Sequence, residues 1–125
     1  MIWESASDIK KKVGLLVKKL GISHIDPKRI ICFRSFGSKS RARARIWSLP
    51  RIWQLALKVK PAYCIEILSE KFDKLSEDDK TKVLIHELLH IPKTFSGALL
   101  PHRGRGRIRI DMRVVNKLFK KLGNG

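Results

Sequence analysis

The segment from Ser76 to Pro92, SEDDKTKVLIHELLHIP, constrains the fold of this chain more than any other, because it specifies a helix with defined ends. The Ser76 side chain is suited to cap a helix, and the three acidic residues after it favour the positive end of the helix dipole. Pro92 disfavours helical backbone at the residue before it, so we expect the helix to end near His90 or Ile91.

This helix carries two of the four histidines of the chain. His86 and His90 are four residues apart and project from one face, one turn apart, so both imidazoles can bind one metal ion. Glu87 is then placed to accept a proton from a metal-bound water. The pattern predicts a hydrolytic metal centre. The alternative is a helix with two hydrogen-bonded histidines and an ion-paired glutamate. His24, in a loop, is expected to be a surface histidine.

A catalytic zinc usually has three protein ligands and a water. Downstream of His90 the candidates for the third ligand are His102 and Asp111. We prefer His102, because the helix ends at Pro92 and Gly97 allows the following loop to double back. Asp111 is better explained as the cap of a last helix.

Two amphipathic helices are expected near the ends of the chain. The first is capped by Ser7 and stopped by Gly21, and the last is capped by Asp111 and stopped by Gly123. Each has apolar residues at helical spacing on one face.

Strand patterns occupy the part of the chain between these helices. Residues 29–36 and 62–68 are rich in β-branched and aromatic residues and predict strands. The alternating stretch 41–50 predicts a partner for 29–36 in a hairpin. Residues 51–57 fit either a strand or a short helix.

The length of 125 residues and the apolar content of 43% predict a single folded domain over residues 1–125. The chain has no apolar run long enough to span a bilayer, and its N-terminus lacks the apolar core of a signal peptide. We therefore expect a cytoplasmic protein with no membrane partner.

Cys32 and Cys64 lack the spacing of a zinc-binding pair. Two reduced thiols that pack as small hydrophobic side chains are the preferred interpretation. A disulfide bond is the alternative, and it would fit a hyperthermophilic host.

The net charge of +17 favours anionic partners such as nucleic acid. Residues 27–65 contain ten Lys and Arg and no acidic residue. Two rows of arginines repeat every second residue, which in a strand puts them on one face about 6.6 Å apart. Such rows suit phosphate binding with little base specificity, and a solvated charged surface is the alternative. The rows are Arg41, Arg43 and Arg45, and Arg103, Arg105, Arg107 and Arg109.

The segments CFRS…GSKSRARARIW, AYCIEILSEKFDKLS and VLIHELLHIPKTFSGALLPH resemble a family of archaeal and phage metallopeptidases, which are small zincins. The resemblance covers most of residues 29–102. It implies an α+β zincin-like fold, in which a small, twisted, mainly antiparallel sheet packs on the active-site helix. It also implies zinc bound by His86, His90 and His102, with Glu87 as the general base.

The mechanism that follows is hydrolysis of a peptide bond. The polypeptide substrate is expected along a sheet edge, which we assign to the strand at 62–68. Tyr63 and Arg103 are candidates to stabilise the transition state, although Tyr63 fits the role of a packed strand aromatic better.

Two other functions compete with a zinc metallopeptidase, which would act on nucleic-acid-associated proteins. The first is a basic nucleic-acid-binding protein or a zinc-dependent nuclease, whose arginine rows hold phosphate. The second is a binding module with a structural metal, which would not require Glu87.

Overall fold

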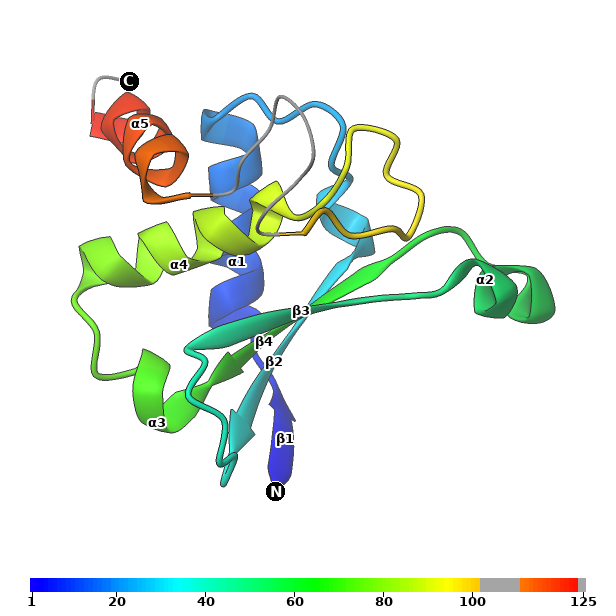
Figure 1. The fold of residues 1–125 in the computed structure, drawn as a ribbon, viewed down its shortest axis with the longest axis horizontal. Helices are drawn as coiled ribbons and strands as arrows, with labels where there is room; N and C mark the ends of the chain where they lie inside the picture. Colours follow the sequence, from blue (N-terminus) through cyan, green and yellow to red (C-terminus); the bar gives the residue numbers. More distant parts are fainter. Residues whose placement is uncertain (102–110, 124–125) are drawn as a thin grey trace.

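Four strands form one open, mixed sheet flanked by five helices in the computed structural model, which describes residues 1–101 and 111–123 (Figure 1). This arrangement confirms the predicted α+β class. The strands are β1 (Ile2–Ser5), β2 (Ile30–Phe36), β3 (Ala44–Ser48) and β4 (Tyr63–Leu68). The helices are α1 (Ser7–Lys19), α2 (Arg51–Leu57), α3 (Ser69–Phe72), α4 (Glu77–Leu89) and α5 (Met112–Gly123), with a short 3-10 helix at Pro27–Arg29.

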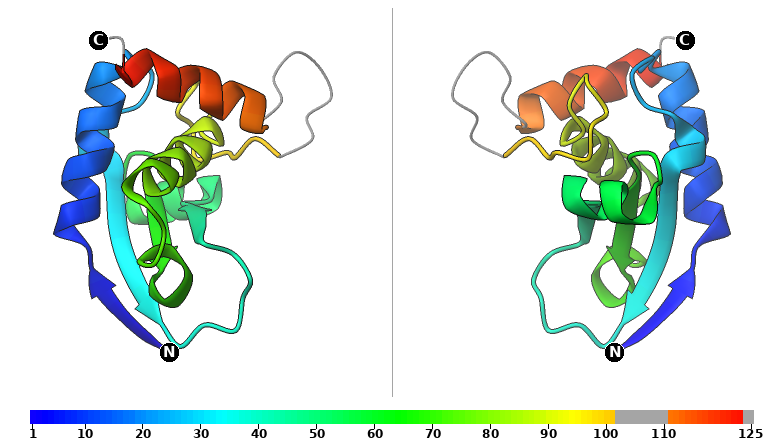
Figure 2. Two further views of the ribbon diagram at one scale, coloured as in Figure 1. Left: turned by 90° about the vertical axis from the view of Figure 1, so that its left-hand side faces the viewer. Right: turned by 90° about the vertical axis from the view of Figure 1, so that its right-hand side faces the viewer.

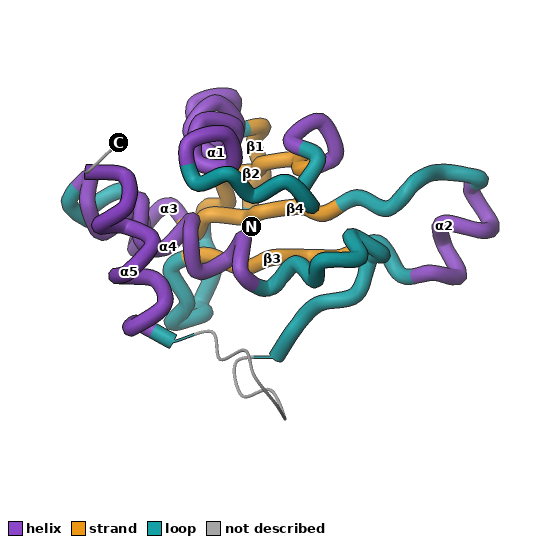
Figure 3. Tube along the Cα trace, turned by 90° about the horizontal axis from the view of Figure 1, so that it is seen from above, coloured by secondary structure: helices purple, strands orange, loops and turns teal. Residues whose placement is uncertain are grey.

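The strand order is β1-β2-β4-β3, so β4 lies inside the sheet (Figure 3). β2 pairs with β4 in parallel, and both β1 with β2 and β3 with β4 are antiparallel. The predicted hairpin between residues 29–36 and 41–50 is therefore wrong. β4 takes the place between the two strands because five of its six residues are buried, as an interior strand requires.

The placement of a substrate along the strand at 62–68 is also wrong, because both sides of β4 are already paired. The edges of the sheet are β1 and β3. β3 is the edge next to α4, the helix that carries the histidines (Figure 1).

One face of the sheet forms the hydrophobic core with α1 and α4. Strand residues at the centre of this face, among them Ile30, Ile65 and Ile67, are fully buried. Leu84 and Leu88 of α4 are buried in the same cluster, and α5 packs across α4 (Figure 2). None of the described helices is long and apolar enough to cross a membrane.

Two of the predicted helix caps are confirmed and one is wrong, and the predicted stop at Gly123 lies within α5, the last described helix. The Ser76 side chain accepts a hydrogen bond from the Asp79 N–H, and Asp111 accepts one from the Val114 N–H, which confirms both caps. The expected Ser7 cap is wrong, because α1 begins at Ser7 itself and Ala6 precedes it without a side-chain bond.

Residues 51–57 form a helix, α2, which extends away from the sheet (Figure 3). Lys58 ends it in a left-handed conformation, with φ of 55°. Gln54 is its single buried residue and points back to the rest of the molecule. β1 was not expected, because its four residues are all exposed and show no apolar alternation.

Cys32 and Cys64 are free thiols. Cys32 is aligned with Ile65 and Cys64 with Ile31, so the two cysteines project from opposite faces of the sheet. This geometry agrees with the preferred interpretation of two separate packed thiols and excludes a bond between them within this sheet.

A buried ion pair lies on the sheet face opposite the core. Glu66 is only 1% exposed and accepts hydrogen bonds from Arg45 Nε (3.2 Å), Arg45 Nη2 (3.3 Å) and Trp47 Nε1 (2.8 Å). Burial raises the pKa of the carboxyl group, but hydrogen bonds from Ser35, Trp47 and Arg45 outweigh it. The pKa of Glu66 therefore lies below its ordinary value of 4.5.

We expect Glu66→Gln to make the stability of the protein less dependent on pH. Because the pKa of Glu66 is lower in the folded than in the unfolded state, its charge stabilises the fold above pH 4.5. That contribution disappears as the pH falls through the folded-state pKa. Urea unfolding should give a variant about 1–3 kcal/mol less stable than wild type near neutral pH.

The difference in unfolding free energy should shrink steadily as the pH is lowered below 4.5. Glu4→Gln, at an exposed position of β1, serves as the control and should leave the pH profile unchanged. If the unfolding free energies of Glu66→Gln and wild type differ by the same amount at every pH, the lowered pKa of Glu66 in the folded state is contradicted.

Candidate metal centre

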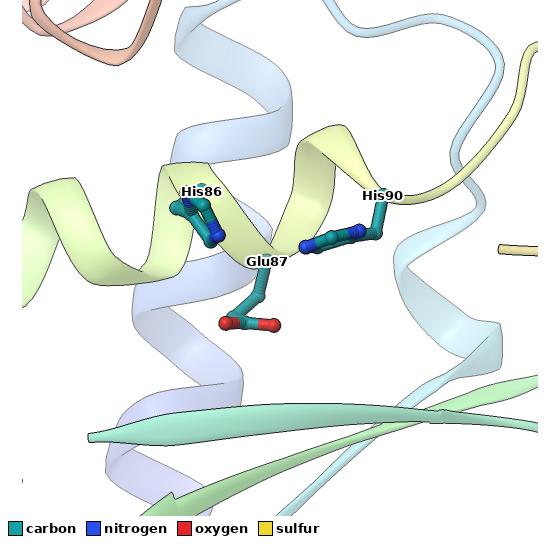
Figure 4. Close-up of side chains that lie close together, drawn as sticks. All are labelled: His86, Glu87 and His90. Atoms are coloured by element: carbon teal, nitrogen blue, oxygen red, sulfur yellow. The ribbon is translucent and has the colours of Figure 1, made fainter. Parts of the chain in front are cut away.

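Three side chains of α4 converge on the side of the helix that faces the sheet (Figure 4). One nitrogen or oxygen atom from each of His86, Glu87 and His90 lies within 4.8 Å of the other two. The imidazole rings meet edge to face, with their centroids 5.1 Å apart and their planes at 75°. The helical spacing thus brings together the donors that the sequence predicts.

The orientation of His90 is set by two hydrogen bonds to Leu100. The Leu100 N–H donates to the His90 carbonyl at 2.7 Å, and His90 Nδ1 donates to the Leu100 carbonyl. A proton on Nδ1 leaves the lone pair of the imidazole on Nε2, which is the tautomer that a metal ligand needs. A backbone carbonyl bonded to the second nitrogen is typical of metal-binding histidines.

Tyr63, at the start of β4, holds the loop that brings Leu100 to His90. Its hydroxyl donates to the Ala98 carbonyl at 2.8 Å and accepts from the Gly97 N–H at 2.9 Å. Its ring meets the Phe95 ring edge to face at 5.1 Å. Because Tyr63 is 1% exposed and its hydroxyl has both partners, these contacts favour the packing role over contact with a transition state.

Gly97 is required by the same loop. Its φ is +94°, and a Cβ atom added there would lie 2.2 Å from Gln54 Nε2 and 2.6 Å from the Leu49 carbonyl oxygen. Gln54 Nε2 also donates to the Ser96 carbonyl at 3.0 Å and so attaches the loop to α2. The F-x-G step, Phe95 to Gly97, is therefore a structural device that positions the metal-binding helix end.

Glu87 lies between the two histidines and is 7% exposed. Burial raises the pKa of its carboxyl group to about 7. A carboxyl group with this pKa can both accept and release a proton near neutral pH, as a general acid and base must do.

The three side chains line a cleft of about 890 Å³. Its walls come from α4, from residues 41–46, from residues 99–101 and from Met112. β3 contributes Ala44 to Ile46 to these walls. The side chains of His86, Glu87 and His90 therefore lie across the cleft from the free edge of the sheet (Figure 4). This geometry can hold an extended chain beside a metal ion.

The first arginine row does not form the predicted strand face. Arg41 and Arg43 precede β3 and are exposed at the cleft, whereas Arg45 lies in β3 and pairs with Glu66. The strand starts only at Ala44, which explains why the alternation in sequence does not become one row in space. His102 and the second row, Arg103, Arg105, Arg107 and Arg109, lie outside the described residues.

Two residues that support the site were not singled out from the sequence. Gln54 is the buried residue of α2. The one feature of the sequence that could have indicated its role is that it is a glutamine within an apolar segment. His24 is half-buried, and its Nε2 lies 3.2 Å from the Ile91 carbonyl at the end of α4. It was expected to be a surface histidine, and nothing in its local sequence indicates this contact.

The donor set fits a metal ion, because two imidazoles and a carboxylate are gathered in a buried cleft and His90 has the ligand tautomer. The family described as "Putative phage metallopeptidase" matches residues 1–118. The chain belongs to the phage metallopeptidase family. Comparison with curated proteins and with solved structures gives no match.

Membership of the phage metallopeptidase family and the His86–Glu87–His90 group agree on a metal-dependent hydrolase of peptide bonds. The small α+β fold, with an active-site helix packed on a four-stranded sheet, is that of a small zincin-like domain.

Gly97→Ala should weaken metal binding, although residue 97 is not a ligand. The added Cβ would overlap Gln54 and Leu49 and displace the loop that orients His90. We expect affinity for an added divalent metal to fall about 10- to 100-fold, as for other losses of support behind a ligand. Competition with a chromogenic chelator measures this affinity.

Gly14→Ala is the matched control, because an added Cβ at Gly14 in α1 meets nothing within 4 Å. Its metal affinity should equal that of wild type. A Gly97→Ala variant that also binds metal like wild type would show that the loop does not position His90.

Proposed function

We propose that the protein is a zinc-dependent peptidase in which His86, His90 and His102 bind one zinc ion per chain. The observation that carries this proposal is the buried group of His86, Glu87 and His90 in a cleft beside a free strand edge. His102 is supported as the third ligand by its neighbours in sequence. Pro101 lines the cleft, and Leu100 is bonded to His90.

Zinc held by these ligands would lower the pKa of a water molecule and polarise the scissile carbonyl. Glu87 would accept the proton of that water and pass it to the amine of the leaving peptide. The burial of Glu87 supports this role, since it raises the pKa of the carboxyl group toward neutrality.

The substrate would bind as an extended segment along β3. One side of β3 pairs with β4 and the other is a sheet edge, whose backbone N–H and C=O groups can add a further strand. Residues 44–46 of this strand line the cleft that contains Glu87. Arg103, directly after the proposed third ligand, is the candidate to stabilise the negative charge of the transition state.

The basic residues favour substrates that are themselves bound to nucleic acid. Arg41 and Arg43 are exposed at the cleft, where they would contact phosphate next to a bound polypeptide. The second row, Arg103 to Arg109, follows the proposed third ligand in sequence and would extend this contact.

A zinc-dependent nuclease is the second candidate function. The same two arginines favour it, because they could hold a phosphodiester in the cleft that contains the metal ligands. The buried Glu87 and the adjacent strand edge favour the peptidase. The backbone N–H and C=O groups of a strand edge pair with the backbone of an extended polypeptide, and a nucleic acid has no such backbone.

The test is cleavage of a quenched fluorogenic peptide library and of labelled DNA and RNA by zinc-loaded protein. Peptides should be cleaved, and Glu87→Gln should reduce the rate about 10²- to 10⁴-fold while the zinc content is unchanged. Glu77→Gln, the same substitution at the exposed start of α4, is the control and should keep full activity.

Cleavage of DNA or RNA without cleavage of any peptide would establish the nuclease and overturn the peptidase. Peptide cleavage that survives Glu87→Gln would show that another residue moves the proton.

A further inference from the structure

The sheet face opposite the catalytic helix carries exposed aromatic and apolar side chains. The strand register places Trp3, Ile31 and Trp47 on this face, on β1, β2 and β3 respectively. They are 48%, 41% and 47% exposed, whereas Ile30 and Cys32 of β2 and Ala44 of β3, on the core face, are buried. In Figure 1, α1 and α4 both lie on the other side of the sheet.

We call the side chains of Trp3, Ile31, Arg45, Trp47 and Glu66 on this face the platform. At its centre, the charges of Arg45 and Glu66 neutralise each other. Among the described strand residues on this face, Glu66 is the one acid, and Arg45 and Trp47 lie over it and pair with it. The Arg45 guanidinium is 5.6 Å from the centroid of the Trp47 ring, a cation–π contact that fixes both side chains. The described strand residues of this face therefore expose no acidic group that would repel a polyanion, and the exposed Glu4 of β1 lies on the other face.

Cations flank the platform at both ends of the strands. The register aligns the start of β2 with the start of β4 and the end of β3, and Arg29 and Lys60 lie near that end, where Arg29 Nη2 donates to the Lys60 carbonyl. Lys39, which is exposed, lies in the loop that joins β2 to β3 at the opposite end, whereas Arg41 and Arg43 of that loop line the cleft of the candidate metal centre. These three cations, Arg29, Lys39 and Lys60, belong to the stretch 27–65, which contains no acidic residue.

We infer that this face binds single-stranded DNA, with bases stacked on Trp3 and Trp47 and phosphates held by the flanking cations. Sequence-tolerant binders of single strands combine exposed aromatic rings with a basic surface in this way. A duplex keeps its bases stacked on each other and cannot offer their faces to the tryptophans.

The choice of DNA over RNA rests on the polar side chains of the same face. A protein that requires RNA must contact the 2′-hydroxyl group. At the centre, Ser35 and Glu66 are 0% and 1% exposed, so neither can reach a bound sugar, and the partly exposed Arg45 is paired with Glu66. The exposed hydroxyl group of the face, that of Ser5, lies at the end of the edge strand β1. The inference does not depend on peptidase activity, because the platform and α4 lie on opposite sides of the sheet.

Fluorescence anisotropy of a labelled 20-nucleotide oligo(dT) tests the inference, in metal-free protein and at several salt concentrations. Trp3→Leu and Trp47→Leu should each weaken binding about ten-fold, the effect of losing one stacked base. Trp53→Leu is the matched control, since Trp53 is 54% exposed but lies on α2, away from the face, and should bind like wild type.

Trp3→Leu keeps the test valid if Trp47→Leu fails to fold, because Trp3 lies half exposed on an edge strand. Lys39→Gln with Lys60→Gln, which removes one exposed cation at each end of the strands, should make the plot of log affinity against log salt concentration shallower by about 1.4.

Three results would overturn the inference. Equal affinity of wild type and both platform variants would show that the basic surface binds without the platform. Tighter binding of a duplex than of the single strand would exclude stacking. Binding of an RNA of the same sequence more than ten-fold tighter than the DNA would identify RNA as the occupant.

Discussion

The interior position of β4 is the constraint on which the rest of the molecule depends. Its residues on one face, such as Ile65, complete the core under α1 and α4, and Glu66 on the other face anchors Arg45 and Trp47. Its first residue, Tyr63, bonds the loop that orients His90. One strand therefore supports the core, the candidate metal centre and the opposite face, and it leaves β3 as the free edge beside α4.

Local features of the structure could be predicted from the sequence because their causes are local. The caps at Ser76 and Asp111, the stop at Gly21 and the shared face of His86 and His90 each depend on a few neighbouring residues. The proximity of His86 and His90 is predictable for the same reason, since one turn of helix is sufficient to bring the two imidazoles together.

The order of the strands could not be predicted from these patterns, because it depends on contacts between distant segments. The alternation in residues 41–50 indicates a strand but does not say that β4 will lie between it and β2. The contact of Gln54 with Ser96 and that of His24 with Ile91 join residues 42 and 67 positions apart, and no local signal marks them. The sequence indicates that Gly97 allows the loop to turn. It does not show that Gln54 and Leu49 leave no room for a Cβ atom at this position.

The central proposal is that His86, His90 and His102 bind one zinc ion. Metal content of protein purified without added zinc, measured by inductively coupled plasma mass spectrometry, tests it most directly. The account predicts one zinc per chain in wild type, Glu87→Gln and Asp111→Ala, and its loss in His86→Ala, His90→Ala and His102→Ala. Wild-type protein that contains no metal and cannot be loaded with zinc would contradict the account.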